Sequence, residues 1–208
     1  MDKRATRRAG HARPFYVSDD DAPGKHRILV TALELFVRDG LCETSVRDIA
    51  KASGFTNPAL FKHFRSKDHL ARYLFERCYL QLEQLVSDAI ASEDTFIRKQ
   101  RAVIDAYLAA LDRDADSVLY VVDWLRYFWP QMPENVRRRS IVGDVRRLLE
   151  TGRGEGKVTN EIDIELLTTA WLGTLQQFAR FKYFGEFKQP TRALAEALDG
   201  LLTRMERS

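Results

Sequence analysis

Residues 25–72 constrain the fold most tightly, because three short amphipathic patterns follow one another there with a cap or stop signal at nearly every boundary. The apolar residues of the first pattern recur at the spacing of one buried helical face. They are Ile28, Leu29, Ala32, Leu33 and Phe36. Gly40 follows them, and a glycine that can adopt positive φ commonly ends a helix. The first helix is therefore expected to end at this glycine.

Two shorter helices are expected after this glycine. Ser45 offers an N-cap hydroxyl, and Asp48 follows it by three residues, which approximates a capping box. Gly54 is expected to end this second helix in a tight turn. Either Thr56 or Asn57 can cap the third helix. The segment therefore predicts two short helices joined by a glycine-containing turn, which is typical of a helix-turn-helix motif.

The second helix of such a motif lies in the major groove of DNA, with its N-terminal residues at the base edges. Asn57 can hydrogen-bond an adenine edge, and the methyl group of Ala59 can contact a thymine methyl. Other side chains are placed to meet phosphates, which fix the register without reading the sequence. They are Thr56, Lys62, His63 and Lys67. The alternative is a three-helix core whose charged face is merely solvated.

The run TSVRDIAKASGFTNPALFKHFRSKDHL resembles the DNA-binding domain of the TetR/AcrR transcriptional regulators, and the similarity covers roughly residues 25–75 without a gap. The resemblance implies base contacts near Asn57, Pro58 and Ala59. It also implies phosphate contacts from Ser45, Arg47, Thr56, Lys62, His63 and Lys67. The family usually has tyrosine where this chain has Phe61, so the hydroxyl that would reach a phosphate is missing there.

The basic excess of the chain lies with this segment. Residues 1–78 carry 15 Lys and Arg against 10 Asp and Glu, whereas residues 79–208 carry 18 against 20. A basic DNA-binding part is the expected electrostatic footprint. Residues 1–22 are expected to form a flexible tail, because residues 1–13 include five basic residues and no apolar periodicity. This tail either contacts DNA as a minor-groove arm or stays solvated.

The rest of the chain predicts helices only, so the fold class is all-α. The expected helices cover about 66–91, 95–112, 117–129, 134–151, 162–184 and 190–206. We therefore expect three parts: the tail over 1–22, the helix-turn-helix domain over 23–72, and an all-helical regulatory and dimerisation domain over 73–208.

Aromatic residues crowd three helices of this last part. Such crowding is often plain core, but the resemblance implies a domain that binds a small molecule, and apolar pockets with a few polar groups are usual ligand sites. We expect an apolar or aromatic effector between Tyr107, Tyr120, Trp124, Phe128, Trp171 and Phe178, with Gln176 or Asp123 as a polar anchor. In this mechanism the ligand shifts helix 66–91 and releases the regulator, most simply a repressor, from DNA.

The last two helices are expected to form a homodimer, as the resemblance implies. Small residues allow close approach of helices, and an apolar stripe lies near the chain end. The residues expected at the interface are Ala170, Gly173, Gln177, Leu194, Leu198 and Leu201. Twofold symmetry would match a palindromic operator with half-sites one helical turn apart. The alternative is a DNA-binding dimer without a small ligand, controlled by a protein partner.

Other function classes find little support in the sequence. There is no H-E-x-x-H or G-x-S-x-G motif and no metal-ligand spacing, so neither an enzyme nor a cofactor nor a metal is expected. The glycine run 152–157 fails as a phosphate loop, because Thr151 and Val158 stand where such a loop needs glycine and Ser/Thr. Cys42 and Cys78 lack CxxC spacing, and no apolar run could span a membrane. A cytoplasmic protein with reduced thiols is therefore expected.

Overall fold

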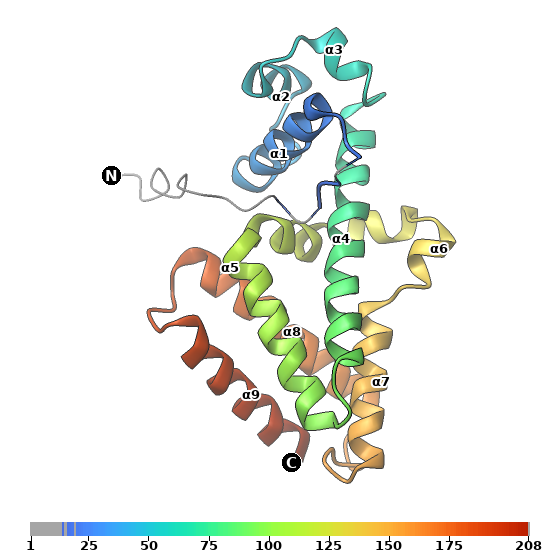
Figure 1. The fold of residues 1–208 in the computed structure, drawn as a ribbon, viewed down its shortest axis with the longest axis vertical. Coiled ribbons are helices and arrows are strands. Elements are labelled where there is room, and N and C mark those ends of the chain that lie inside the picture. Colours follow the sequence, from blue (N-terminus) through green and yellow to red (C-terminus); the bar gives the residue numbers. More distant parts are fainter. Residues whose placement is uncertain (1–13, 15, 19, 208) are drawn as a thin grey trace. The chain divides into compact units, whose positions relative to one another are not determined.

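The computed structural model describes residues 14, 16–18 and 20–207, and every regular element in these ranges is a helix (Figure 1). The chain divides into two compact units after Arg77. The predicted boundary after residue 72 falls slightly earlier, within the same helix. The all-α fold class is thus confirmed. The basic arm expected over residues 1–13 lies outside the described residues and stays a prediction.

The first unit contains α1 (Pro23–Arg38), α2 (Val46–Ser53), α3 (Asn57–Phe61) and the start of α4 (Lys67–Ala91). The predicted capping box is present, because Ser45 Oγ accepts from the Asp48 N–H at 3.2 Å while Asp48 Oδ2 accepts from the Ser45 N–H at 2.9 Å. Gly54 ends α2 with φ +74°, a left-handed conformation that favours glycine. Thr56, rather than Asn57, caps α3. The ends of these helices are therefore set by residues close by in the sequence.

The inner faces of these helices meet in one small core. The fully buried side chains come from the four helices and from the turn after α3: Ile28, Leu29, Leu33, Phe36, Ile49, Leu60, Phe64, Leu70 and Leu74. Those of α1 match the predicted apolar face. Burying side chains of this size stabilises a fold by roughly 1.5–3 kcal/mol each. This packing holds the short helix α3, which has too few residues to be stable alone.

The segment before α1 is packed against the unit, so the expected flexible tail is wrong for the described residues from Tyr16 onward. Tyr16 and Val17 are buried, and Arg77 Nε donates to the Tyr16 carbonyl at 2.7 Å. Asp21 lies between Lys25 Nζ at 3.0 Å and Arg77 Nη2 at 3.1 Å. Burial raises the pKa of Asp21, but the Ser18 N–H and the two cations lower it overall. The ion pairs and the buried aromatic ring anchor this segment.

The second unit contains α5 (Phe96–Phe128), α6 (Glu134–Arg137), α7 (Ile141–Gly154), α8 (Ile164–Phe184) and α9 (Thr191–Arg207), with a 3₁₀ turn at Trp129–Gln131. Helix α5 is broken at Asp114, whose backbone leaves the helical region at φ −156° and ψ 72°. Asp114 Oδ1 accepts from the Ser117 N–H at 3.2 Å, as an N-cap does. The two helices predicted over 95–112 and 117–129 are therefore two segments of one kinked run.

The single helix predicted over 134–151 is wrong, because the structure divides it into α6 and α7. Ser140 caps α7 by accepting from the Gly143 N–H at 3.2 Å, and the Ile141 N–H donates to the Tyr79 hydroxyl at 3.2 Å. The second bond comes from α4, which is far away in the sequence. Local periodicity could not reveal it.

The glycine run 152–157 is a packing feature. A Cβ on Gly152 would lie 2.5 Å from Val158 Cγ2 and 2.8 Å from Phe96 Cδ2, so only glycine fits there. The Glu155 carboxylate accepts from the Phe96 N–H at 3.0 and 3.1 Å and caps the start of α5. Within the described ranges, no acidic, histidine or cysteine cluster could hold a metal ion, and no helix is apolar and long enough to cross a membrane.

Candidate nucleic-acid interface and ligand cavity

Helix α3 presents its outer face to solvent while Leu60 fixes its inner face in the core. Pro58, Phe61, Lys62 and His63 are exposed, and Asn57 and Ala59 are half-buried. Phe61 exposes 47% of its surface, which is unusual for a phenylalanine in a small core. The outward face of α3 therefore presents the Asn57 amide and the small apolar Pro58 and Ala59 near its N-terminus. The cationic Lys62 and the imidazole of His63 follow at its C-terminal end.

The residues expected to contact phosphates differ in their availability. Arg47 is exposed on α2, and the Thr56 hydroxyl accepts from the Ala59 N–H at 3.4 Å, which leaves its own proton free to donate. The Ser45 hydroxyl instead donates to Asp48 Oδ2 at 2.6 Å. Ser45 therefore serves mainly as the helix cap.

Lys67 does not match its predicted role as a phosphate contact. Its Nζ donates to the carbonyl oxygens of Leu41 at 2.8 Å and Thr44 at 2.9 Å, with the Cys42 carbonyl at 3.4 Å. An ammonium group has three protons to donate, so these bonds use its donors. Lys67 thus ties the start of α4 to the loop between α1 and α2.

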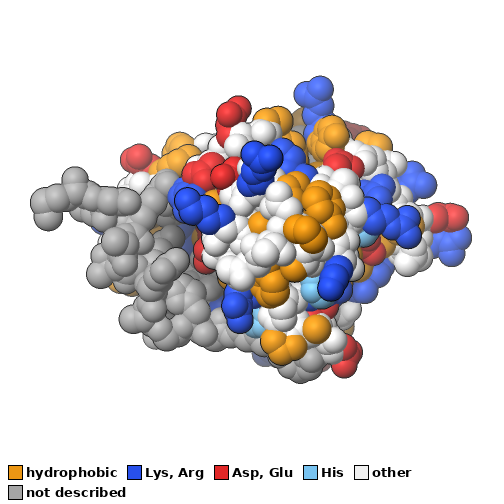
Figure 2. Space-filling model, turned by 90° about the horizontal axis from the view of Figure 1, so that it is seen from above, with side chains coloured by type: hydrophobic (Ala, Val, Ile, Leu, Met, Phe, Trp, Pro, Cys, Tyr) orange, Lys and Arg blue, Asp and Glu red, His pale blue; other side chains and the backbone are white. Residues whose placement is uncertain are grey.

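Beyond the expected residues, exposed cations also lie on α2 and directly after α3. Lys51 lies on α2 and Arg65 follows α3, and both are exposed. Figure 2 shows lysine and arginine side chains distributed among hydrophobic ones over the face viewed from above. Such a surface suits DNA, because the cations can contact phosphates while the apolar and amide groups of α3 meet the base edges.

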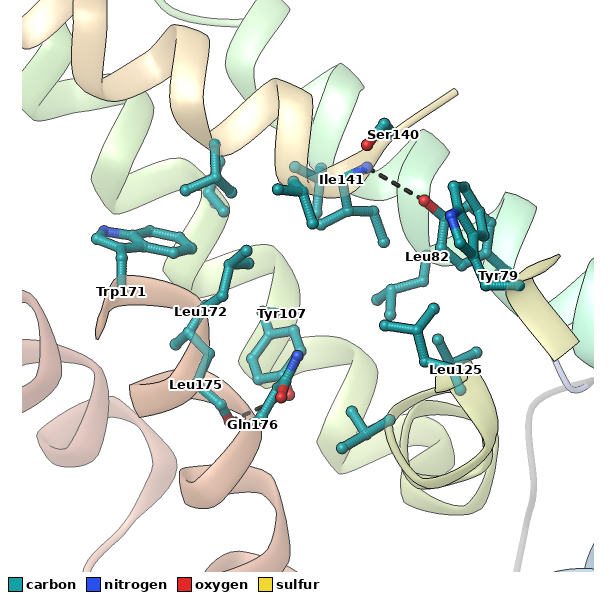
Figure 3. A pocket seen from close by; sticks show the side chains of 17 residues that line it. Tyr79, Leu82, Tyr107, Leu125, Ser140, Ile141, Trp171, Leu172, Leu175 and Gln176 are labelled. Atoms are coloured by element: carbon teal, nitrogen blue, oxygen red, sulfur yellow. Dashed lines mark hydrogen bonds between the residues drawn. The ribbon is translucent and has the colours of Figure 1, made fainter. Parts of the chain in front are cut away.

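The second unit encloses a cavity of about 410 Å³ between α4, α5, α7 and α8 (Figure 3). Most of its lining is aliphatic or aromatic, and no lining side chain carries a charge. The lining residues are Tyr79, Leu82, Val86, Val103, Tyr107, Val121, Val122, Leu125, Trp129, Ser140, Ile141, Val142, Val145, Trp171, Leu172, Leu175 and Gln176. A cavity of this size and composition falls within the range of small-molecule sites.

The two phenol groups on the cavity wall are already hydrogen-bonded to protein. Tyr79 donates to the Arg139 carbonyl at 3.0 Å, and Tyr107 donates to the Leu175 carbonyl at 3.2 Å. Burial raises the pKa of Tyr79 to about 12 and raises that of Tyr107 further, so both stay neutral. The Gln176 amide also lies on this wall and has no protein hydrogen bond among the described contacts.

Known proteins with similar sequences and structures indicate the family. Residues 28–74 match the model of bacterial regulatory proteins of the tetR family. The HTH-type transcriptional repressor KstR2 of Rhodococcus jostii strain RHA1 is 29% identical over 169 residues, covering 74% of this chain and 81% of KstR2. A tetR-family regulatory protein from Rhodococcus RHA1 superposes with a TM-score of 0.75 at 20% identity, covering 89% of this chain and 98% of the other. Together these similarities support a TetR/AcrR family transcriptional regulator.

A further solved structure has the same fold. The regulator FadR from Bacillus subtilis, in complex with stearoyl-CoA, superposes with a TM-score of 0.66 at 19% identity, covering 85% of this chain and 96% of FadR. These relatives are transcriptional regulators and not enzymes. The helix-turn-helix of this TetR/AcrR regulator is accordingly a DNA-binding motif, and its α-helical second unit occupies the place of the family's regulatory domain.

The residues expected in the ligand pocket are divided between the cavity wall and other parts of the second unit. Tyr107, Trp171 and Gln176 line the cavity. Tyr120 and Phe128 instead lie in the closed core, and Trp124 packs on Phe128 with ring centroids 6.0 Å apart. The two remaining expected residues also lie elsewhere. Phe178 stacks on Phe187 at 4.7 Å, and the exposed Asp123 pairs with Arg180 at 2.8 Å.

Most of the lining residues that were not expected from the sequence come from α4, α5 and α7. On α4, Tyr79, Leu82 and Val86 recur at i, i+3 and i+7, so they form one helical stripe. On α7, Ile141 and Val145 are four residues apart and face the same space. These periodic stripes were visible in the sequence, but nothing local distinguishes a stripe that lines a cavity from one that packs a core.

The surface of α8 carries a continuous stripe of small and apolar residues. Leu166, Phe181 and Phe184 expose 61%, 46% and 66% of their surfaces, and Gly173 and Gln177 are exposed between them. A Cβ on Gly173 would meet nothing within 4 Å, so this part of the helix is open. The half-buried Ala170 lies on the same stripe. We call Leu166, Ala170, Gly173, Gln177, Phe181 and Phe184 the α8 stripe.

Two residues expected at the dimer interface are wrong. Leu194 and Leu198 expose only 7% and 4% of their surfaces, because they face the core of their own chain. Leu201, by contrast, exposes 49% on the other side of α9. The apolar periodicity of α9 therefore reports packing within the chain, whereas Leu201 is available to a partner.

Proposed function

We propose that this chain is a homodimeric repressor that binds a palindromic operator and is released by a lipid-like effector in the cavity of its second unit. The observation that carries the proposal is the uncharged apolar cavity of about 410 Å³ in a chain that also has a helix-turn-helix. A fully packed core would have favoured the alternative, a dimer controlled only by a protein partner. The cavity counts against that alternative.

The lining indicates the chemistry of the effector. An ionised group inside would lack a partner, since no lining residue is charged, and an unpaired buried charge is very costly. The buried part of the effector is therefore neutral and mostly hydrocarbon, with at most one polar group that can meet the Gln176 amide. FadR of Bacillus subtilis was solved with stearoyl-CoA, which supports a long acyl chain as the first candidate. Its charged end would stay outside this cavity.

Helix α4 supplies a route by which the effector can act on DNA binding. It is one uninterrupted helix from Lys67, directly after the helix-turn-helix, to Ala91, and Tyr79, Leu82 and Val86 form part of the cavity wall. An effector that pushes this wall shifts α4 and with it the recognition helix of each protomer. The coupling free energy is expected at about 1–3 kcal/mol, and DNA must weaken effector binding by the same factor.

The α8 stripe and Leu201 supply a surface for the second protomer. Gly173 has no side chain and lies open, so two copies of α8 can approach closely there. The exposed Phe181 and Phe184 extend this surface, and apolar patches of this kind commonly mark interfaces. Two helices from each protomer then form a four-helix bundle about a twofold axis. This symmetry would require an operator made of two inverted half-sites.

The test has two stages. Duplexes are first selected from a random DNA library at a stated salt concentration, and enrichment of an inverted repeat is expected. Fluorescence anisotropy on that operator then follows release by stearoyl-CoA and by uncharged acyl or polycyclic compounds. Salt-sensitive binding without an enriched sequence would contradict the operator, and unchanged affinity with every apolar compound would contradict the effector.

A cavity-filling variant makes the second stage specific. Val122 lines the cavity and is half-buried, so Val122→Trp should fill part of it and abolish the response to the effector while leaving operator binding intact. The matched control is Ile97→Trp, because Ile97 is exposed on α5, does not line the cavity and lies outside the α8 stripe. Equal responses of the two variants would place the effector elsewhere.

A further inference from the structure

A carboxylic acid lies buried near the end of α9. Glu206 exposes only 1% of its surface, although glutamate is almost never fully buried without a partner. Its two carboxyl oxygens form no hydrogen bond of ordinary geometry within the described structure, and the same holds for Gln100 Oε1 and Trp171 Nε1. The Glu206 carboxyl interacts with the side chains of both Gln100 and Trp171. One buried cluster thus gathers all of these unsatisfied atoms from α5, α8 and α9.

The orientation of the Gln100 amide decides what this cluster needs. Gln100 Nε2 donates to Asp199 Oδ1 and to Thr203 Oγ1, both at 3.2 Å. Since an ionised aspartate only accepts, the nitrogen must face Asp199, which leaves Oε1 as the amide atom available to Glu206. Two acceptor oxygens facing each other are unfavourable unless one carries a proton. A neutral carboxylic acid can donate to Gln100 Oε1 and accept from the Trp171 N–H at the same time.

The charges around Glu206 favour this neutral form. Burial raises the pKa of Glu206 to about 7. A hydrogen bond donated by Gln100 would lower this pKa, but Gln100 Nε2 is directed at Asp199 and Thr203 instead. The charge of Asp199 raises the pKa, while the Trp171 N–H and the charge of Arg207 lower it. On α5, Arg101 lies 3.8 Å from Asp199 and 3.1 Å from Asp105, so its charge is shared. Thr203 faces the cluster from α9 as a neutral group. The Thr159 N–H donates to the backbone carbonyl of Glu206 at 2.7 Å and thereby fixes this end of α9.

Trp171 connects this cluster to the ligand cavity. Its side chain is 1% exposed and forms part of the cavity wall. In Figure 3 the ring nitrogen of Trp171 lies at the end of the indole that points away from Ile141 and Leu82. The same ring therefore meets the cavity with its hydrocarbon edge and the Glu206 cluster with its N–H.

We propose that Glu206, as a neutral acid, is a positioning residue that holds the Trp171 indole in the wall of the effector cavity. This inference rests on the proposed function insofar as the cavity binds an effector. Loss of the proton sets the carboxylate against the Gln100 oxygen, so the carboxylate moves away from it and draws the Trp171 N–H out of its former orientation. Effector binding thereby becomes sensitive to pH in the neutral range through a residue that does not itself line the cavity.

The first test observes Trp171 without effector or DNA. The chain has three tryptophans, so a ¹⁵N-labelled sample shows three indole N–H signals, and Trp171→Phe assigns one of them. We expect the Trp171 signal to move with a midpoint near pH 7 in the wild-type protein and to stay fixed in Glu206→Gln. The amide of this variant imitates the neutral acid. Glu196→Gln, an exposed change on the same helix, is the matched control and should titrate like the wild type.

A second variant keeps the test decisive if Glu206→Gln does not fold. Asp199→Asn removes a charge that raises the pKa of Glu206, so the Trp171 midpoint should move to lower pH. A Trp171 signal that does not move between pH 5.5 and 8.5, or that moves equally in Glu206→Gln, would overturn the proposal. A titrating signal in a protein that binds no apolar compound would instead contradict the proposed function and leave the Glu206 cluster standing.

Effector affinity gives the final readout. Between pH 6 and pH 8 the dissociation constant of the wild-type protein for the best compound of the panel should rise by roughly three- to tenfold, and that of Glu206→Gln should stay constant.

The free energy of unfolding of the two proteins gives a comparison that needs no effector. Because the folded-state pKa of Glu206 lies above its ordinary value of 4.5, the wild type loses stability as the pH rises from about 4.5 towards 7. Glu206→Gln should lack this loss, and an equal loss in both proteins would contradict the assignment.

Discussion

The two units of the chain differ in how directly their structure follows from nearby residues. In the first unit, Ser45, Gly54 and Thr56 each end or begin a helix through atoms within four positions along the chain. In the second unit, the break before α7 depends on Tyr79, and the tight packing of Gly152 depends on Phe96. Contacts between residues close in the sequence set the helix ends of the DNA-binding unit. Contacts between residues far apart in the sequence shape the unit that forms the cavity.

This difference between the two units matches their different functional requirements. A surface that reads DNA must hold a few side chains at fixed spacing, and short capped helices achieve this with local interactions. A cavity for a small molecule is the space that four helices leave between them, so its walls can change without changing any cap. The first unit therefore keeps its pattern, while the second can adapt to another effector.

The largest expected effect concerns the α8 stripe, the proposed contact surface of the second protomer. Phe181→Glu combined with Phe184→Glu places two charges on the proposed interface and should convert the dimer to a monomer. Operator affinity should fall by more than about 100-fold, because the second half-site no longer benefits from linkage. Sedimentation and operator titration measure both changes. Ile97→Glu is the control, since Ile97 on α5 exposes 46% of its surface, as Phe181 does; equal losses in both proteins would argue against this interface.

The next effect tests whether distant packing dominates the second unit. Gly152→Ala should lower the free energy of unfolding by about 1–3 kcal/mol, because the new Cβ would lie 2.5 Å from Val158 and force the neighbours apart. Gly154→Ala, two residues later in the same helix, meets nothing within 4 Å and should be neutral or stabilising by up to about 1 kcal/mol. Denaturant unfolding compares the two. Similar losses would mean that helix propensity, rather than packing, governs this position.

These contacts also explain how far the sequence could predict the molecule. The positions of the helix ends in the first unit were predictable, because their signals are short-range. Lys67 was misassigned because its partners, the carbonyls of Leu41 and Thr44, lie more than 20 residues away. Leu194 and Leu198 were misassigned because a helical stripe does not say whether it faces its own chain or another. Three of the eight expected pocket residues line the cavity, since aromatic crowding marks core and cavity alike.

The next prediction concerns Asn57, on the face of α3 that is expected to meet the base edges. Asn57→Ala should weaken binding to the selected operator by about 1–3 kcal/mol and leave non-specific binding nearly unchanged, because a bidentate base contact carries sequence information. The measurement is the affinity for the operator and for an unrelated duplex at the same salt concentration. Lys51→Ala serves as the control: it removes an exposed charge on α2 and should affect both duplexes alike. A uniform loss for Asn57→Ala would assign Asn57 to phosphate contact.

The smallest effect separates two lysines that look alike in the sequence. Lys62 is exposed on the outer side of α3, whereas Lys67 donates to the backbone between α1 and α2. Lys62→Met should reduce the dependence of log affinity on log salt concentration by about one unit and leave stability unchanged. Lys67→Met should leave the salt dependence unchanged and lower stability by roughly 1 kcal/mol, because it frees buried carbonyl groups. If Lys67→Met reduced the salt dependence instead, the contact within the unit would have to open on DNA, and the first unit would then be less locally determined than its caps indicate.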